Sequence, residues 1–239
     1  MKSLAFAGLF IYLMLVAANV EKTTFIAPEV LTVPQDAAID NLLLQSLNPD
    51  NFSVKTYLNA SFPTPEQPKG LETWALLEGL IPGRRYELRV CWLATQPTTF
   101  WLYTHTLPEV FETSELITSL SAYSFARHDR LSKMEIEHLQ SSRFKLKTAS
   151  TDSSMLLLRV HAAADYFSLN ETLMKHVPPV HIDLILDPYL LNIFPQSLLS
   201  TAGYIVVIAV VAWFLSAWIY QQLSFVVAKH KVSAGKKTD

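Results

Sequence analysis

The sequence predicts a mainly β protein, built as an antiparallel β-sandwich that is followed by a single C-terminal transmembrane helix. Short segments rich in β-branched and aromatic residues alternate with turn signals, a spacing that is typical of sandwiches. A long apolar run near the C-terminus predicts the helix. Cys91 is the single cysteine among 239 residues, so the sandwich must be stabilised by its core and not by an internal disulfide. The expected strands span residues 23–33, 52–60, 73–77, 86–94, 98–105, 155–162 and 180–186.

The N-terminus has the pattern of a secretory signal peptide. Lys2 precedes an uninterrupted apolar run, residues 4–16, and two small residues, Ala17 and Ala18, follow it. Cleavage is expected near Ala18, after which residues 19–187 would form one domain outside the cytosol. The run is shorter than the roughly twenty residues that cross a bilayer. The alternative is an uncleaved anchor.

Three parts of the domain do not have a strand pattern. Residues 37–47 and 133–139 have helical character, and residues 62–70, with three prolines, are expected to form a loop. We interpret residues 107–150 as one long excursion of a single β-rich domain. A second small domain is the alternative for this region.

The stretch from Leu80 to Tyr86, Leu-Ile-Pro-Gly-Arg-Arg-Tyr, predicts a tyrosine corner. Pro82 and Gly83 suit the two central positions of a type II turn. The hydroxyl of Tyr86 is then expected to bind the backbone a few residues upstream. This pattern is similar to that of fibronectin type III domains and favours an immunoglobulin or fibronectin III-like sandwich.

Residues that carry chemistry elsewhere do not form a recognisable catalytic motif here. Cys91 would need a neighbouring base to act as a nucleophile, and the sequence places none beside it. Asp183 and Asp187 share one face of an expected strand with His181, where solvated side chains are more common than an acid–base pair. The histidines lack metal-ligand spacing. We therefore expect no catalytic residue, cofactor, metal or nucleic-acid partner.

Three sequons, at Asn51, Asn59 and Asn170, all lie in the expected lumenal domain. Their joint placement predicts a glycosylated surface.

The segment 188–197, directly before the apolar run, is apolar and aromatic and is interrupted by two prolines. We interpret it as an interfacial segment that meets the bilayer or a membrane partner. Its candidate contact residues are Pro188, Tyr189, Phe194 and Pro195. The alternative is a simple linker.

Residues 198–220 are long and apolar enough to cross the membrane as a helix. Lys229 and Lys231 follow this run, whereas Asp183 and Asp187 precede it, so the positive-inside rule places the tail, residues 221–239, in the cytosol. The protein is therefore expected to be a single-pass type I membrane protein.

The chain ends in Lys236-Lys237-Thr-Asp. Two lysines at these positions resemble the dilysine retrieval signal of endoplasmic reticulum (ER) membrane proteins, an address that a receptor reads. The alternative is a stop-transfer cluster that ends in two lysines by chance.

Two stretches resemble the fungal Pga1 family, co-activators of GPI mannosyltransferase II. The first is L-x-P-G-x-x-Y-x-x-R-V-C-W, from Leu80 to Trp92, with Trp74 upstream; the second is D-P-Y-L-L-N-I-F-P-Q-S-L-L-S, from Asp187 to Ser200. The resemblance implies a non-catalytic ER subunit that stabilises a multispanning mannosyltransferase, the enzyme that adds the second mannose to the GPI precursor. It implies no catalytic residues.

Two other functions agree with the same layout. One is a stabilising subunit of the first GPI mannosyltransferase, as in Pbn1 or PIG-X. The other is a p24-like cargo receptor, a class that normally has a lumenal cysteine pair and a coiled coil before the membrane. The single Cys91 and the prolines at 188 and 195 count against the receptor.

Overall fold

A computed structural model of the chain describes residues 19–30, 39–136 and 154–235. The chain forms two compact units, the first ending at Ile193 and the second beginning at Phe194. The expected signal peptide, residues 1–18, and the dilysine pair, Lys236 and Lys237, lie outside the described residues. So does the part of the excursion beyond residue 136.

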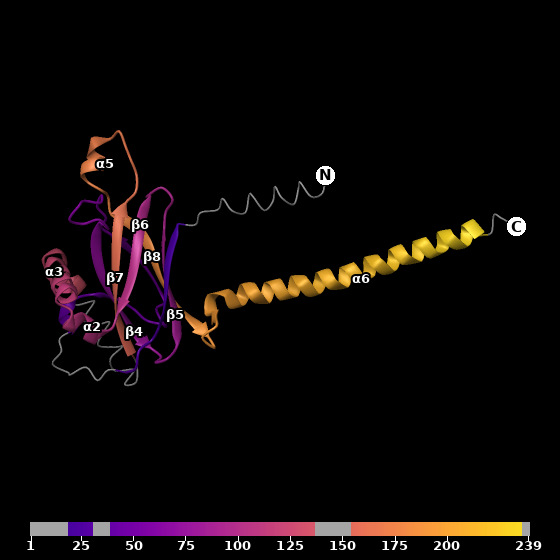
Figure 1. Ribbon diagram of the computed structural model, residues 1–239, viewed down its shortest axis with the longest axis horizontal. Coiled ribbons are helices and arrows are strands. Elements are labelled where there is room, and N and C mark those ends of the chain that lie inside the picture. The colour runs from indigo at the N-terminus through magenta and orange to yellow at the C-terminus, as the bar shows by residue number, and fades with distance from the viewer. Residues whose placement is uncertain (1–18, 31–38, 137–153, 236–239) are drawn as a thin grey trace. The chain divides into compact units, whose positions relative to one another are not determined.

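The first unit contains two β-sheets that pack face to face, as Figure 1 shows. One sheet has the order β1-β5-β8-β3, with every neighbouring pair antiparallel. Its strands are β1 (Val20–Ile26), β3 (Ser53–Leu58), β5 (Arg85–Trp92) and β8 (Val180–Leu190). This arrangement confirms the mainly β sandwich.

The second sheet has the order β2-β4-β7-β6. Its strands are β2 (Gln45–Leu47), β4 (Leu71–Leu80), β6 (Thr98–His105) and β7 (Ser154–Ala164). β2 pairs with β4 in parallel, whereas the other two pairs are antiparallel. Among the described residues of the short helix expected at 37–47, only a 3₁₀ turn forms, η1 (Ile39–Leu42), because residues that follow it join the sheet.

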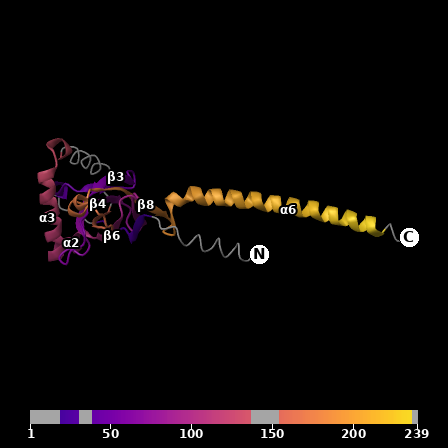
Figure 2. The ribbon, with the colours of Figure 1, turned by 90° about the horizontal axis from the view of Figure 1, so that it is seen from above.

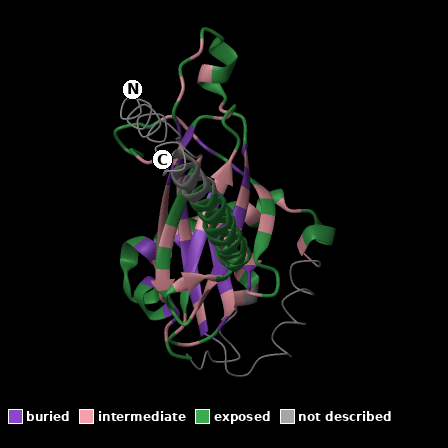
Figure 3. Ribbon diagram, turned by 90° about the vertical axis from the view of Figure 1, so that its right-hand side faces the viewer, coloured by how far each residue is buried: buried purple, intermediate pink, exposed green. Residues whose placement is uncertain are grey.

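The core lies between the two sheets and follows the period-two alternation of the strands. On β5, the side chains of Tyr86, Leu88 and Val90 point into it, and all three are completely buried. Figure 3 shows the buried residues gathered on the strands of the sandwich. Burial of one such side chain contributes about 1.5–3 kcal/mol. Core residues from the partner strands include Ala75, Leu77, Phe100, Leu156, Leu158, Val160, Ile182, Leu184 and Leu186.

The region after β6 is helical and covers the outer face of the second sheet. A capping box of Thr106 and Glu109 starts α2 (Leu107–Glu112), and α3 (Ser114–Arg130) follows. Figure 2 shows both helices together on one side of the strands. They form a second apolar cluster with β4 and β7, through Trp74, Leu76, Val110, Leu116, Leu120 and Leu157. The described part of the excursion thus packs on the second sheet, and its assignment to a single domain stays a prediction. Residues 133–136 are helical, and the remainder of the expected helix lies outside the described residues.

A short helix, α5 (Glu171–Lys175), precedes β8, and β8 continues to Leu190, four residues past the end that the sequence predicts. Pro188 is tolerated within it because the last residue pair with β3 is Ser53–Ile185. Beyond that pair β3 no longer borders β8, so a proline that lacks an N–H donor removes no ladder bond with β3.

The second unit consists of β9 (Phe194–Pro195), η2 (Gln196–Leu198) and α6 (Leu199–Gly235). Within residues 196–225, the most apolar window of 18 residues has a mean hydropathy of 2.3, so α6 is long and apolar enough to cross a membrane. Figure 3 shows nearly all of its described residues as exposed. An apolar helix with no buried face is suited to lipid or to other apolar helices.

Candidate functional site

The turn between β4 and β5 has the geometry of a tyrosine corner. Pro82 and Gly83 are its central residues, and the N–H of Arg84 donates to the carbonyl of Ile81 at 3.1 Å. Gly83 has φ +72°, the value that the second central residue of a type II turn requires. The buried hydroxyl of Tyr86 accepts a hydrogen bond from the N–H of Ile81 at 3.0 Å. The corner therefore fixes one end of the sandwich.

The turn at the end of β8 is hydrogen-bonded to this corner. The side chain of Asn192 accepts from the N–H of Arg85 at 2.8 Å and donates to the carbonyl of Gly83 at 2.9 Å. In addition, Nε of Arg84 donates to the carbonyl of Tyr189 at 3.0 Å. The two motifs that carry the family resemblance are thus joined in the first unit, although more than 100 residues separate them in the chain.

The four residues predicted to contact membrane or partner are found in two places. Pro188 and Tyr189 are strand residues of β8, with Pro188 opposite Tyr86 of β5. Phe194 and Pro195 form β9 in the second unit, and both are half-buried. The segment therefore begins as part of the sandwich, and its proposed contacts stay a prediction.

Four charged residues on the outer face of the first sheet, Lys22, Glu87, Arg89 and Asp187, form a paired network. Glu87 and Asp187 are buried and lie opposite each other, and Arg89 contacts both. Arg89 Nη2 is 3.3 Å from Asp187 Oδ2, and its Nε is 3.5 Å from Glu87 Oε1. Lys22 also contacts Glu87, at 3.4 Å. A network in which each carboxylate is paired is suited to holding three strands together and not to moving protons.

Cys91 lies on the same face, opposite Asp183 of β8. Burial raises the pKa of its thiol, the charge of Arg89 lowers it, and the charge of Asp183 raises it again. The net effect is a raised pKa, so the neutral thiol dominates at neutral pH. A thiol of this kind is a poor nucleophile.

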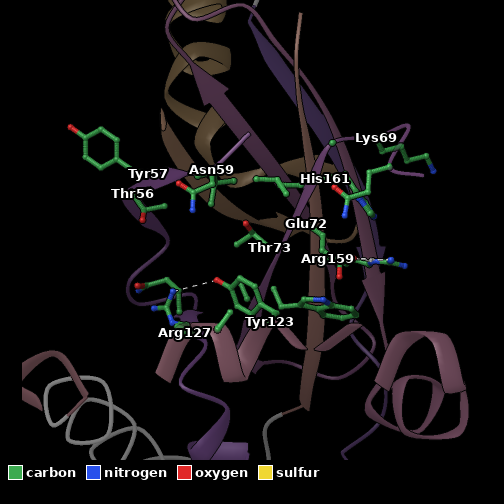
Figure 4. Close-up of a pocket in the computed structure, with 18 of the residues that line it drawn as sticks. Thr56, Tyr57, Asn59, Lys69, Glu72, Thr73, Tyr123, Arg127, Arg159 and His161 are labelled. Carbon is green, nitrogen blue, oxygen red and sulfur yellow. Dashed lines mark hydrogen bonds and ion pairs between the residues drawn. The ribbon is translucent and has the colours of Figure 1, made fainter. Parts of the chain in front are cut away.

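A pocket of about 760 Å³ lies beside β4, between β3, α3 and the loop that precedes β4 (Figure 4). Its position follows from the short β2, which pairs only with residues 75–77 of β4 and leaves the first half of that edge open. Figure 4 shows Glu72 and Arg159 together on one side of the pocket, with Tyr123 and Arg127 of α3 near its lower side. The sequence did not predict this pocket.

Three of the charged side chains that line the pocket form ion pairs with one another. Arg159 Nη2 is 2.8 Å from Glu72 Oε2, and its Nη1 is 3.5 Å from Glu115 Oε1. The hydroxyl of Ser119 donates to Glu72 and accepts from Nε1 of Trp74 at 2.9 Å. This arrangement fastens α3 to β4, so that Glu72 is a structural ion-pair partner and not a free base.

His161 completes the polar edge of the pocket. Its pKa is lowered by burial first and by the charge of Arg159 second, so the ring is neutral at neutral pH. The period-two pattern of β7 places Arg159 and His161 on one face, which was the available signal for this cluster. Among the described residues, no group of three or more His, Cys, Asp or Glu side chains could hold a metal ion.

The three sequons all fall on exposed asparagines. Asn59 follows β3 and lines the pocket, and Asn51 precedes β3. Asn170 caps α5, where its side chain accepts from the N–H of Thr172 at 3.0 Å. Glycosylation at these positions remains a prediction.

Among the described residues, the fold defines a class of protein: a β-sandwich joined to an apolar helix that could span a membrane. A stretch of 53 residues, 22% of the chain, is 40% identical to a Schizosaccharomyces pombe protein named as a GPI mannosyltransferase 2 subunit. The match spans 30% of that protein's length. No family model matches the chain, and no solved structure matches it.

Proposed function

We propose that the protein is a non-catalytic ER membrane subunit that stabilises the GPI mannosyltransferase adding the second mannose to the GPI precursor. The observation that carries this proposal is the 40% identity over 53 residues to a protein named as a GPI mannosyltransferase 2 subunit. The resemblance of the corner and juxtamembrane motifs to the Pga1 family supports the same enzyme.

A non-catalytic role is supported by the state of the candidate catalytic groups. The thiol of Cys91 has a raised pKa, and the carboxylates of Glu87 and Asp187 are paired with Arg89. Glu72 of the pocket is paired with Arg159. Transfer of a sugar needs a group with a suitable pKa beside the reacting atoms, and these side chains do not supply one.

The proposed partner is the multispanning catalytic subunit, which α6 would contact within the bilayer. Ala202, Ala209 and Ser216 recur every seven residues, so they lie on one face of α6. Small residues at such spacing allow another helix to approach closely, where van der Waals packing drives association in lipid. A type I orientation, with the sandwich in the ER lumen, follows from the lysines after the apolar run.

Purification of the tagged full chain in mild detergent, with mass spectrometry of the proteins that accompany it, tests this proposal. A GPI mannosyltransferase catalytic subunit is the expected companion. Replacement of Ala209 by Phe should reduce its recovery, whereas Val211→Phe, on another face of the same helix, should not. Recovery of the first mannosyltransferase would favour the Pbn1-like alternative, and recovery of vesicle cargo would favour a p24-like receptor.

A further inference from the structure

One end of the sandwich presents four large apolar side chains to solvent. The exposed fractions are 57% for Ile26, 52% for Ile81, 92% for Leu191 and 78% for Ile193. Hydrogen bonds bring three chain segments together at this end. The backbone of Ala27 bonds to the backbone of both residues that follow Pro82 in the corner. The bonds of Asn192 add the end of β8. We call these four residues the apolar rim.

Leu191 holds its exposed position in a conformation that leucine rarely adopts. The N–H of Ile193 donates to the carbonyl of Leu190 at 3.1 Å, which closes a turn with Leu191 and Asn192 in its centre. Their φ angles are +52° and +59°, the pattern of a type I′ turn. Asparagine tolerates the left-handed region, but a leucine there is strained. A strained backbone at a residue whose large apolar side chain is exposed to water suggests that this residue has a function.

Two arginines stand beside the apolar rim. Arg85 is exposed and Arg84 is half-buried, and the two lie next to Ile26, which pairs with Arg85 in the sheet. In the part of the chain that the structure describes, neither guanidinium is within ion-pair distance of a carboxylate. Arginine binds phosphate groups through its fork of N–H donors. The rim therefore combines apolar side chains with donors for an anion.

The length of the connecting chain restricts what can cover the rim. Residues 194–198 are the only ones between Ile193 and α6, and five residues span at most about 18 Å. If α6 crosses the bilayer, the end of the sandwich that holds Ile193 must lie within that distance of the membrane surface. Lipid headgroups are then the nearest abundant anions.

We propose that this end of the sandwich docks on the bilayer surface. The four rim residues enter the headgroup region, and Arg84 and Arg85 bind lipid phosphates, with anionic phospholipid preferred. Docking would hold the lumenal domain at one height and orientation above the membrane. The inference rests on the membrane placement in the proposed function, but it does not depend on which enzyme is the partner.

The test uses the full chain in phospholipid nanodiscs, with Cys91→Ser as the background and one new cysteine carrying an environment-sensitive fluorophore. Labels are placed at Leu191→Cys, at Val210→Cys within α6, and at Leu169→Cys. Leu169 is the matched control, because it is also 92% exposed and follows β7, whose other end lies beside Leu80 near the corner. Lipids that carry a doxyl quencher close to the headgroup or deep in the acyl chain report the depth of each label.

We expect the label at 191 to be quenched by the shallow quencher, the label at 210 by the deep one, and the label at 169 by neither. Quenching at 210 without quenching at 191 would overturn the docking proposal and leave the membrane span intact. Absence of quenching at both positions would overturn the membrane placement and, with it, the docking. A blue-shifted label at 191 that lipid quenchers do not reach would indicate a protein contact and would also contradict docking.

A second experiment tests the role of the two arginines with the double variant Arg84→Gln, Arg85→Gln. Each basic residue near an anionic surface changes binding by about fivefold, so the pair should shift the docking equilibrium by about 25-fold. In nanodiscs with anionic lipid, the variant should lose most of the quenching at 191 and keep that at 210. Unchanged quenching at 191 would contradict the role of the two arginines.

Discussion

Asn192 links the end of β8 to the tyrosine corner through two hydrogen bonds, one donated to the carbonyl of Gly83 at 2.9 Å and one accepted from the N–H of Arg85 at 2.8 Å. Replacement by glycine keeps the left-handed backbone and removes only the side chain. Because a hydrogen bond contributes about 0.5–1.5 kcal/mol, Asn192→Gly should speed amide exchange at Arg85 by roughly tenfold. Leu88, in the middle of β5, should be unaffected, and equal acceleration there would point to a global loss of stability instead.

Tyr86→Phe should destabilise the sandwich. The substitution removes the hydroxyl that accepts from the N–H of Ile81 and leaves that donor without its partner. We expect a loss of about 1–2 kcal/mol in the free energy of unfolding, measured by denaturant titration of the full chain in detergent. Tyr57→Phe is the control, since the Tyr57 side chain is 67% exposed and should change stability little. Equal effects of the two substitutions would show that the corner bond contributes nothing.

Gly70 and Gly83 both have φ near +70°, so alanine at either position has the same backbone strain. A difference in stability between the two alanine variants would then report the steric overlap of the added Cβ. A Cβ on Gly83 would meet open space, so Gly83→Ala should cost only about 1–2 kcal/mol, the penalty of the left-handed region. A Cβ on Gly70 would lie 2.2 Å from the carbonyl oxygen of Ala162. Gly70→Ala should therefore cost more than about 4 kcal/mol. Comparable melting temperatures for the two variants would contradict the close approach of β4 to β7.

His161 should make stability depend on pH. Its pKa is lowered in the folded state, mainly by burial, so the unfolded chain takes up a proton at higher pH than the folded one. The stability that comes from the neutral His161 ring is therefore complete above pH 6.5, the ordinary pKa of histidine. It is lost as the pH falls below 6.5 and through the lower pKa of His161 in the folded state. The melting temperature should decrease when the pH is lowered from about 8 to about 5. His161→Gln should show a shallower decrease; identical slopes would contradict a buried, neutral His161.

The strands were largely predictable because each buries one face between two sheets. Residues 98–105 form a strand with the predicted bounds, and β5 shows the alternation that placed Tyr86, Leu88 and Val90 in the core. The corner was predictable for a different reason: a Pro-Gly pair admits few turns, and Gly83 adopts the φ that this turn requires. Local chemistry was sufficient in both cases.

The parts that were missed depend on contacts between distant segments. β2 is three residues long and is defined by its parallel pairing with β4, which no local pattern indicates. The pocket beside β4 requires both that short pairing and the contacts that hold α3 in place, namely the hydrogen bond of Ser119 to Glu72 and the ion pair of Glu115 with Arg159. Similarly, Pro188 marked an apparent strand end, because the sequence does not show that β3 stops beside Ile185.

Analysis of GPI precursors in cells that lose this protein tests most directly which enzyme the protein supports. We predict that a precursor with one mannose accumulates, because the enzyme that adds the second mannose would lack its subunit. Re-expression of the full chain should restore normal precursors, and the Ala209→Phe variant should restore them less completely than Val211→Phe. Normal GPI synthesis after complete loss of the protein, with delayed export of selected cargo, would contradict the account.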